Sequence, residues 1–105
     1  MAIVPIALVH QDQIIHGIEK AVAALSPDVA RIRYELGEDW SGDSAIFFRV
    51  LLKDSASKRS GLRDVARRVS EKISSEVQPR ELGLQAYFSF RSESEQVTLK
   101  EEGWA

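Results

Sequence analysis

The sequence predicts one α+β domain, a two-layer sandwich in which a three- to four-stranded sheet carries two helices on one face. Its 105 residues suit a single domain. Apolar residues recur at helical spacing in residues 13–25 and 62–77, and they alternate in 29–36, 45–53 and 84–91. The resulting order, helix–strand–strand–helix–strand, is typical of helices packed on a small sheet.

The first elements are read from residues 2–36. Residues 2–9, AIVPIALV, are apolar and fit either a strand or the start of a helix, although Pro5 argues against a central strand. The helix 13–25 ends at the Ser-Pro-Asp sequence that follows it, and Gly17 weakens it. Residues 29–36 alternate between apolar and charged side chains, which predicts a half-buried strand.

The strand at residues 45–53, AIFFRVLLK, is the most informative segment. One face carries Ile46, Phe48 and other large apolar residues, and the opposite face is also apolar because Phe47 and Leu51 flank Arg49. A strand that is apolar on both faces is usually central in its sheet and covered on both sides. We therefore expect something to cover its second face.

The second half of the chain continues with a polar connection over 54–61 and the amphipathic helix 62–77. The strand 84–91 follows, and residues 92–105 are expected to form a polar, acidic tail to the single domain 1–105.

Composition narrows the function classes. The chain has no cysteine, which excludes disulfides, thiolate chemistry and cysteine-bound metals. The absence of cysteine also fits a reducing cytosol, so we expect a cytoplasmic protein. Its longest apolar stretch is far too short to cross a membrane, so no membrane partner is expected, and no cofactor is expected either. The net charge of −2 is unlike that of a strong nucleic-acid binder, although residues 55–91 are basic and the flanking segments are acidic.

The loop 37–44, GEDWSGDS, is the first candidate site. Asp39, Ser41 and Asp43 have the spacing of the first oxygen ligands of a calcium loop, but Ser44 and Val50 occupy the later glycine and glutamate positions of that loop. The carboxylates also suit acid–base chemistry in a small enzyme, without a nearby nucleophile or histidine. The preferred interpretation is a hairpin turn whose Asp and Ser side chains bond their own backbone, with Trp40 folded on the core or at an oligomer contact.

The second candidate is an anion site before the helix 62–77. Lys58, Arg59 and Arg63 are cations at a helix N-terminus, which a bound phosphate would offset. The competing interpretation is an ordinary solvent face with the i, i+4 ion pairs Asp64–Arg68, Arg67–Glu71 and Lys72–Glu76.

The third candidate is the sheet face away from the helices, which presents aromatic residues among arginines. It can be a protein interface, in a homodimer or with a larger partner, or it can stack on RNA bases and hold phosphates. The interface candidates are Phe47, Leu51, Tyr87 and Trp40, and the anion or nucleic-acid candidates on this face are Arg31, Arg33 and Arg49.

Residues 37–50 resemble a block found in short uncharacterised bacterial proteins, a resemblance that implies no activity. With a strand at 2–9 the element order resembles a ferredoxin-like fold. Without it, the order resembles the KH-like ribosome-binding factor A proteins and the cytoplasmic domain of cation diffusion facilitators. The GxxG loop of KH domains is missing from SKRSGLRD. The sequence therefore predicts a non-enzymatic interaction module, with RNA or phosphate binding as the alternative and a small enzyme as a weaker one.

Overall fold

The computed structural model describes residues 11–57 and 62–99. The segment 2–9 lies outside them, and with it the choice between a three-stranded and a ferredoxin-like sheet. The elements follow in the order α2 (Gln11–Leu25), β1 (Val29–Glu38), β2 (Ser44–Leu52), α3 (Asp54–Ser57), α4 (Leu62–Val77), the 3-10 helix η1 (Pro79–Leu82), β3 (Gln85–Ser92) and α5 (Glu93–Leu99).

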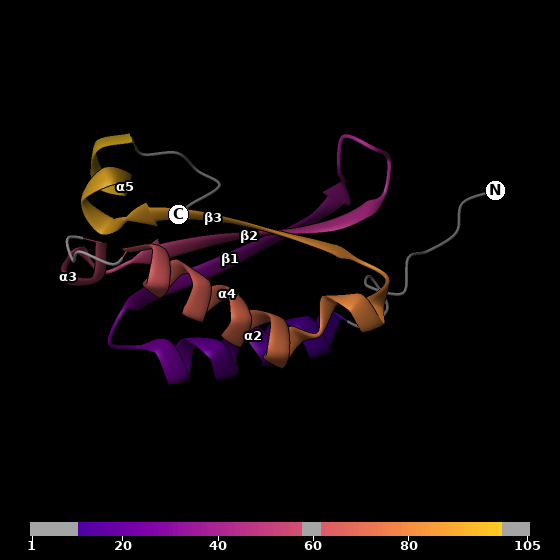
Figure 1. Cartoon of the computed structure of the whole chain (residues 1–105), viewed down its shortest axis with the longest axis horizontal. Coiled ribbons are helices and arrows are strands. Elements are labelled where there is room, and N and C mark those ends of the chain that lie inside the picture. The colour runs from indigo at the N-terminus through magenta and orange to yellow at the C-terminus, as the bar shows by residue number, and fades with distance from the viewer. Residues whose placement is uncertain (1–10, 58–61, 100–105) are drawn as a thin grey trace.

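The described strands form one sheet in the order β1-β2-β3. β1 and β2 are an antiparallel hairpin, while β2 and β3 are parallel and are joined through α3, α4 and η1. Figure 1 shows α2 and α4 beneath the sheet, whereas α5 and the tip of the β1–β2 hairpin rise on its other side. The fold is therefore the expected α+β two-layer arrangement, with β2 at its centre.

The core lies between the sheet and the two long helices. Because side chains alternate along a strand, every second residue of β2 points into this layer, and Ile46, Phe48 and Val50 are fully buried. The buried apolar side chains that complete the layer are Ile14, Ile18, Ala21, Leu25, Val29, Ile32, Leu52, Val65, Val69, Ile73, Val77, Leu82 and Leu84.

Gly17 has a packing reason that the sequence pattern did not indicate. A Cβ atom at this position would lie 2.7 Å from the carbonyl oxygen of Glu76 and 2.8 Å from Cγ2 of Val77. The missing side chain thus lets α2 and α4 approach closely. The glycine that lowers the helix propensity of α2 is therefore a point of close contact between α2 and α4.

Two expectations about loops were incomplete. The connection after β2 begins with the short helix α3, and the acidic tail contains α5. At the start of α5, the Ser92 N–H donates to Oε1 of Glu95 and the Glu95 N–H donates to Oγ of Ser92, both at 3.2 Å. This reciprocal pair is a capping box, which the sequence signature S-x-x-E could have predicted.

The ion pairs of α4 also differ in part from expectation. Arg68 pairs with Asp28, a buried residue in the turn before β1, and Asp64 pairs with Arg67 at 3.4 Å. The predicted Lys72–Glu76 pair is present at 3.1 Å. Arg68 of α4 therefore holds the turn between α2 and β1 in place, because the nearly buried carboxylate of Asp28 needs a charged partner.

Candidate functional site

The face of the sheet opposite α2 and α4, called here the open face, combines aromatic and charged side chains. The strand registers place Arg33 beside Arg49, Glu35 beside Phe47, and Phe47 beside Tyr87. These residues alternate with the core residues of the same strands, so they share the face as the sequence alternation predicts. The face also carries Arg31, Leu51, Ser89 and Arg91.

Helix α5 covers one end of the open face. It contacts β2 and β3, and Leu51 is only 7% exposed. Asp54 of α3 accepts hydrogen bonds from the Ser94 N–H at 3.0 Å and the Ser94 hydroxyl at 2.7 Å, which hold α5 against the end of the sheet. Leu51 therefore packs inside the molecule and is not available to a partner, and the cover expected for β2 comes partly from its own chain.

The other end of the open face carries an aromatic cluster, formed by Trp40, Tyr87 and Phe47. The ring of Tyr87 lies between the other two, with centroids 5.2 Å from Trp40 and 5.5 Å from Phe47. Phe47 and Tyr87 are nearly parallel, while Trp40 is tilted by 58° against Tyr87. Ring separations of this size are typical of favourable aromatic pairs. Trp40 is nevertheless 85% exposed, so the expectation that it folds back on the core is wrong.

The hairpin loop that presents Trp40 is fixed by Asp39. Its Oδ1 accepts hydrogen bonds from the N–H and hydroxyl of Ser41, at 2.9 and 2.7 Å, and from the N–H of Asp43 at 3.0 Å. Its Oδ2 accepts from the Tyr87 hydroxyl at 2.8 Å. Gly42 has φ +84°, a conformation that glycine adopts without a steric cost. The loop is thus closed on itself and tied to β3.

These hydrogen bonds shift two ionisation equilibria. The Ser41 side chain, followed by that of Tyr87, lowers the pKa of Asp39, because both donate to the charged carboxylate. The same contact raises the pKa of Tyr87, since its hydroxyl proton is held by Asp39. Both shifts favour the hydrogen-bonded state at neutral pH, with Asp39 ionised and Tyr87 protonated.

The predicted metal ligands Asp39, Ser41 and Asp43 do come together in this loop. Their polar atoms are already used within it, since the Ser41 hydroxyl also lies 3.3 Å from Oδ2 of Asp43. Within residues 11–57 and 62–99, no group of three or more His, Asp or Glu side chains is arranged to hold a metal ion. The geometry is that of the self-bonded turn, and the engaged carboxylate of Asp39 is poorly placed for acid–base chemistry.

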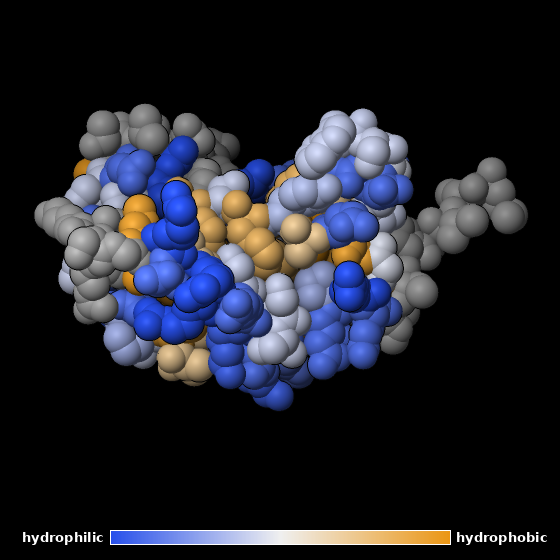
Figure 2. Space-filling model, viewed as in Figure 1, coloured by the Kyte–Doolittle hydropathy of each residue, from blue (hydrophilic) through white to orange (hydrophobic). Residues whose placement is uncertain are grey.

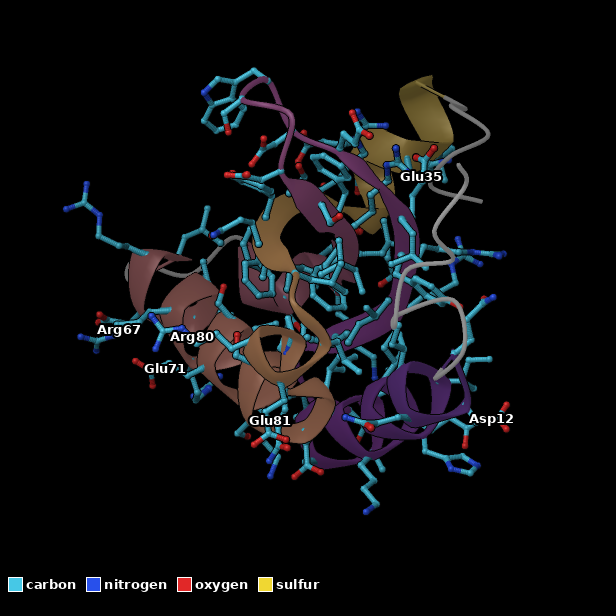
Figure 3. All side chains as sticks on the ribbon, turned by 90° about the vertical axis from the view of Figure 1, so that its right-hand side faces the viewer. Asp12, Glu35, Arg67, Glu71, Arg80 and Glu81 are labelled. Atoms are coloured by element: carbon cyan, nitrogen blue, oxygen red, sulfur yellow. The ribbon has the colours of Figure 1, made fainter. Side chains whose placement is uncertain are left out.

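The arginine candidates divide between two sides of the molecule. Arg49 pairs with Glu35 at 2.7 Å on the open face, beside a shallow depression of about 290 Å³ that Phe47 also lines. Arg63 is exposed on α4, which lies against the other sheet face, so it does not join this group. Lys58 and Arg59 lie outside the described residues. Figure 3 shows Glu35 on the open-face side, while Arg67 and Glu71 project outward from α4.

Comparisons with protein-family models, with curated proteins and with solved structures found no match for the chain. No helix in the described part of the chain is long and apolar enough to span a membrane.

Proposed function

We propose that the protein is a non-enzymatic interaction module that binds a protein partner through the aromatic cluster on its open face. The observation that carries this proposal is the combination of exposure and order at Trp40. The side chain is 85% exposed, yet a ring contact with Tyr87 and a loop closed by Asp39 hold it in place.

An ordered, exposed tryptophan suits the anchor of an interface. Tryptophan, tyrosine and arginine are enriched among the residues that contribute most to protein binding. A side chain already held in its bound position loses less conformational freedom on binding, which favours affinity. Truncating such an anchor typically costs about 2 kcal/mol or more, or roughly a 30-fold loss of affinity.

The charges around the cluster favour a partner segment that carries lysine or arginine. Glu38, Asp39 and Asp43 lie within three residues of Trp40 in the chain, so the hairpin that presents Trp40 is negatively charged. Cationic side chains are attracted both to carboxylates and to the face of an indole ring. The same carboxylates would repel the phosphates of a nucleic acid stacked on that ring.

RNA binding remains the second candidate, and one observation favours it. Arg31, Arg33, Arg49 and Arg91 share the open face with the aromatic residues, as stacking and phosphate-holding side chains do on RNA-binding sheets. The test is an RNA titration at several salt concentrations, comparing the parent with an Arg31→Ala/Arg33→Ala variant. Affinity that falls with salt and with the substitutions supports this candidate, and equal binding by both proteins removes it.

The protein-binding proposal is tested by selecting ligands from a displayed random-peptide library against the parent protein. The dissociation constants of the selected peptides are then measured for the parent, Trp40→Ala and a matched control, Ile15→Ala. Ile15 is another exposed apolar residue, 42% exposed on α2, the helix under the other sheet face.

We expect Trp40→Ala to weaken the selected peptides by about 10-fold or more, and Ile15→Ala to leave them unchanged. The selected peptides should be enriched in lysine or arginine. Because Trp40 is so exposed, its removal should change the free energy of unfolding by no more than about 0.5 kcal/mol, so lost binding cannot come from unfolding. Peptides that bind Trp40→Ala as well as the parent would overturn the proposal.

A further inference from the structure

We propose that two copies of the chain pair through the outer edges of their β3 strands, in antiparallel orientation, to form one continuous sheet. Each copy contributes the three strands found among its described residues. This inference rests on the edge strand and does not depend on the aromatic cluster or on the proposed function.

The two edge strands of the sheet, β1 and β3, differ in how well they are protected against pairing with another strand. The edge strand β1 exposes Arg31, Arg33 and Glu35, charged side chains of the kind that discourage pairing with another strand. The edge strand β3, with the sequence QAYFSFRS, contains one charged residue, Arg91, and no proline. Among the described residues no strand pairs with its outer edge. An unprotected edge with one charge and no proline is a template for another strand.

Apolar side chains border this edge on the helix side of the sheet. Ala86, Phe88 and Phe90 pack against the core but are only partly buried. Figure 2 shows apolar surface in the hollow between the β1–β2 hairpin and α5, the region that β3 crosses in Figure 1. A partner strand would cover this surface.

The sequence of β3 is complementary to itself in one antiparallel register. With the two-fold axis at Phe88, Phe88 faces its counterpart, Ala86 faces Phe90 of the second copy, and Gln85 faces Arg91 of the second copy. Large side chains then meet small ones on either side of a central aromatic pair, and no like charges face each other. Cross-strand pairs of this kind stabilise antiparallel sheets. Moving the axis to Ser89 would instead place Phe88 opposite Phe90 and Ala86 opposite Ser92, which loses the pairing of large side chains with small ones.

The surface beside Ala86 has room for the incoming aromatic residue. A depression of about 480 Å³ lies at the start of β3, and its lining includes the apolar residues Pro79, Leu84 and Ala86 beside polar ones, among them Arg80 and Glu81. A cavity of about 150 Å³ is enough to hold benzene. In the register centred on Phe88, the ring of Phe90 from the second copy reaches this depression, and by symmetry each copy fills the other's.

The arrangement is closed, as homodimer interfaces usually are. A two-fold axis perpendicular to the sheet keeps the helices of both copies on one side and their open faces on the other. The same patch is used on both subunits, so pairing stops at two copies. The dimer would present two aromatic clusters on one surface.

The first test is the mass of the parent protein in solution by light scattering, between roughly 1 and 100 µM, the range of ordinary dimer affinities. We expect twice the chain mass of 11.8 kDa at the higher concentrations. Ala86→Lys should return the protein to the monomer, because it fills the depression and places a charge opposite Phe90. Ala23→Lys, which adds the same charge on the exposed surface of α2, should leave the dimer intact. A parent that stays monomeric throughout the range overturns the inference.

Cysteine cross-linking tests the register itself, and the chain offers a cysteine-free background. Gln85→Cys/Arg91→Cys should form a covalent dimer under mild oxidation. The cysteine at position 85 of one copy would face the cysteine at position 91 of the other copy. Within one chain the two positions are about 20 Å apart, too far for a disulfide. Either single variant should stay uncross-linked, because the register separates identical positions. Failure of the double variant to cross-link, in a protein that circular dichroism shows to be folded, would refute the register. Equal cross-linking of the single variants would refute it as well.

Discussion

Gly17→Ala is the most informative test of the fold, because helix propensity and helix packing predict opposite signs. Alanine is favoured over glycine inside a helix by about 1 kcal/mol. If α2 were an ordinary surface helix at this point, the substitution would stabilise the protein by about that amount.

The structure predicts the reverse. The new Cβ would lie 2.7 Å from the Glu76 carbonyl oxygen, whereas ordinary contacts begin at 3.4 Å, so the helices must separate locally by about 0.7 Å. The obstacle is backbone, which cannot rotate away as a side chain does. Overpacking of this kind costs about 1–3 kcal/mol, and the propensity gain offsets about 1 kcal/mol of it. We therefore expect a net loss of up to about 2 kcal/mol in place of the gain of about 1 kcal/mol that propensity alone predicts.

Urea denaturation of the parent, Gly17→Ala and Ala23→Gly measures this balance. Ala23 is exposed on the same helix, so its substitution reports the propensity effect alone and should destabilise by about 1 kcal/mol. At the upper end of the expected range, a loss of about 2 kcal/mol for Gly17→Ala would lower the melting midpoint by roughly 8–16 °C in a domain of this size. If Gly17→Ala stabilises the protein by about as much as Ala23→Gly destabilises it, the close approach of α2 and α4 is wrong.

Three further predictions concern polar contacts. Asp28→Asn should lower the free energy of unfolding by about 1–3 kcal/mol, because it weakens the pair that Arg68 makes with a nearly buried carboxylate, and a double-mutant cycle with Arg68→Met in urea should show the two effects to be non-additive. Because folding lowers the pKa of Asp39 below its ordinary value of 3.8, its contribution to stability is present above that value and is lost as the pH falls through the folded pKa. The stability difference between the parent and Asp39→Asn should therefore shrink on acidification, and a difference that stays constant down to the lowest pH at which the protein folds would contradict the assigned hydrogen bonds. Folding raises the pKa of Tyr87 above 10.0, so its stabilising effect is present below that value and is lost as the pH rises through the folded pKa. An ultraviolet titration of Tyr34→Phe, which leaves Tyr87 as the one tyrosine, should give a higher midpoint than the same variant carrying Asp39→Asn, and identical midpoints would contradict the contact.

The fold class was predictable because its periodic patterns are strong. Alternation in β1 and in β2 identified both faces of each strand, and the double apolarity around Phe47 and Leu51 identified β2 as the central strand. Both conclusions depend on side-chain direction, which the period of a strand fixes. The boundaries of β1, β2 and β3 agree with the sequence pattern to within a few residues.

The parts that could not be read from periodicity are those decided by tertiary contacts. Helix α5 is short and polar, so its only sequence signal is the capping box at Ser92 and Glu95. The partner of Arg68 lies 40 positions away in sequence, and no local spacing rule points to Asp28. The exposure of Trp40 was equally unreadable, because it depends on how the loop closes around Asp39.

The sequence predicted most residues of the candidate site, and the structure changes which of them are accessible. The aromatic and arginine residues of the open face were identified from alternation alone. The structure removes Leu51 from the accessible surface and adds Trp40 to the same cluster as Tyr87 and Phe47. The acidic loop has the form of the preferred interpretation, a turn whose Asp and Ser side chains bond their own backbone, and Asp39 also ties it to Tyr87 beside Trp40.

The most direct test of the central claim is to map where a selected peptide binds, by following the backbone amide signals of the labelled protein in a nuclear magnetic resonance titration. The account predicts the largest shifts in the hairpin loop 39–43, at Phe47 and at Tyr87, with the indole signal of Trp40 among them. Shifts concentrated on the outward surfaces of α2 and α4, with the loop unchanged, would contradict it.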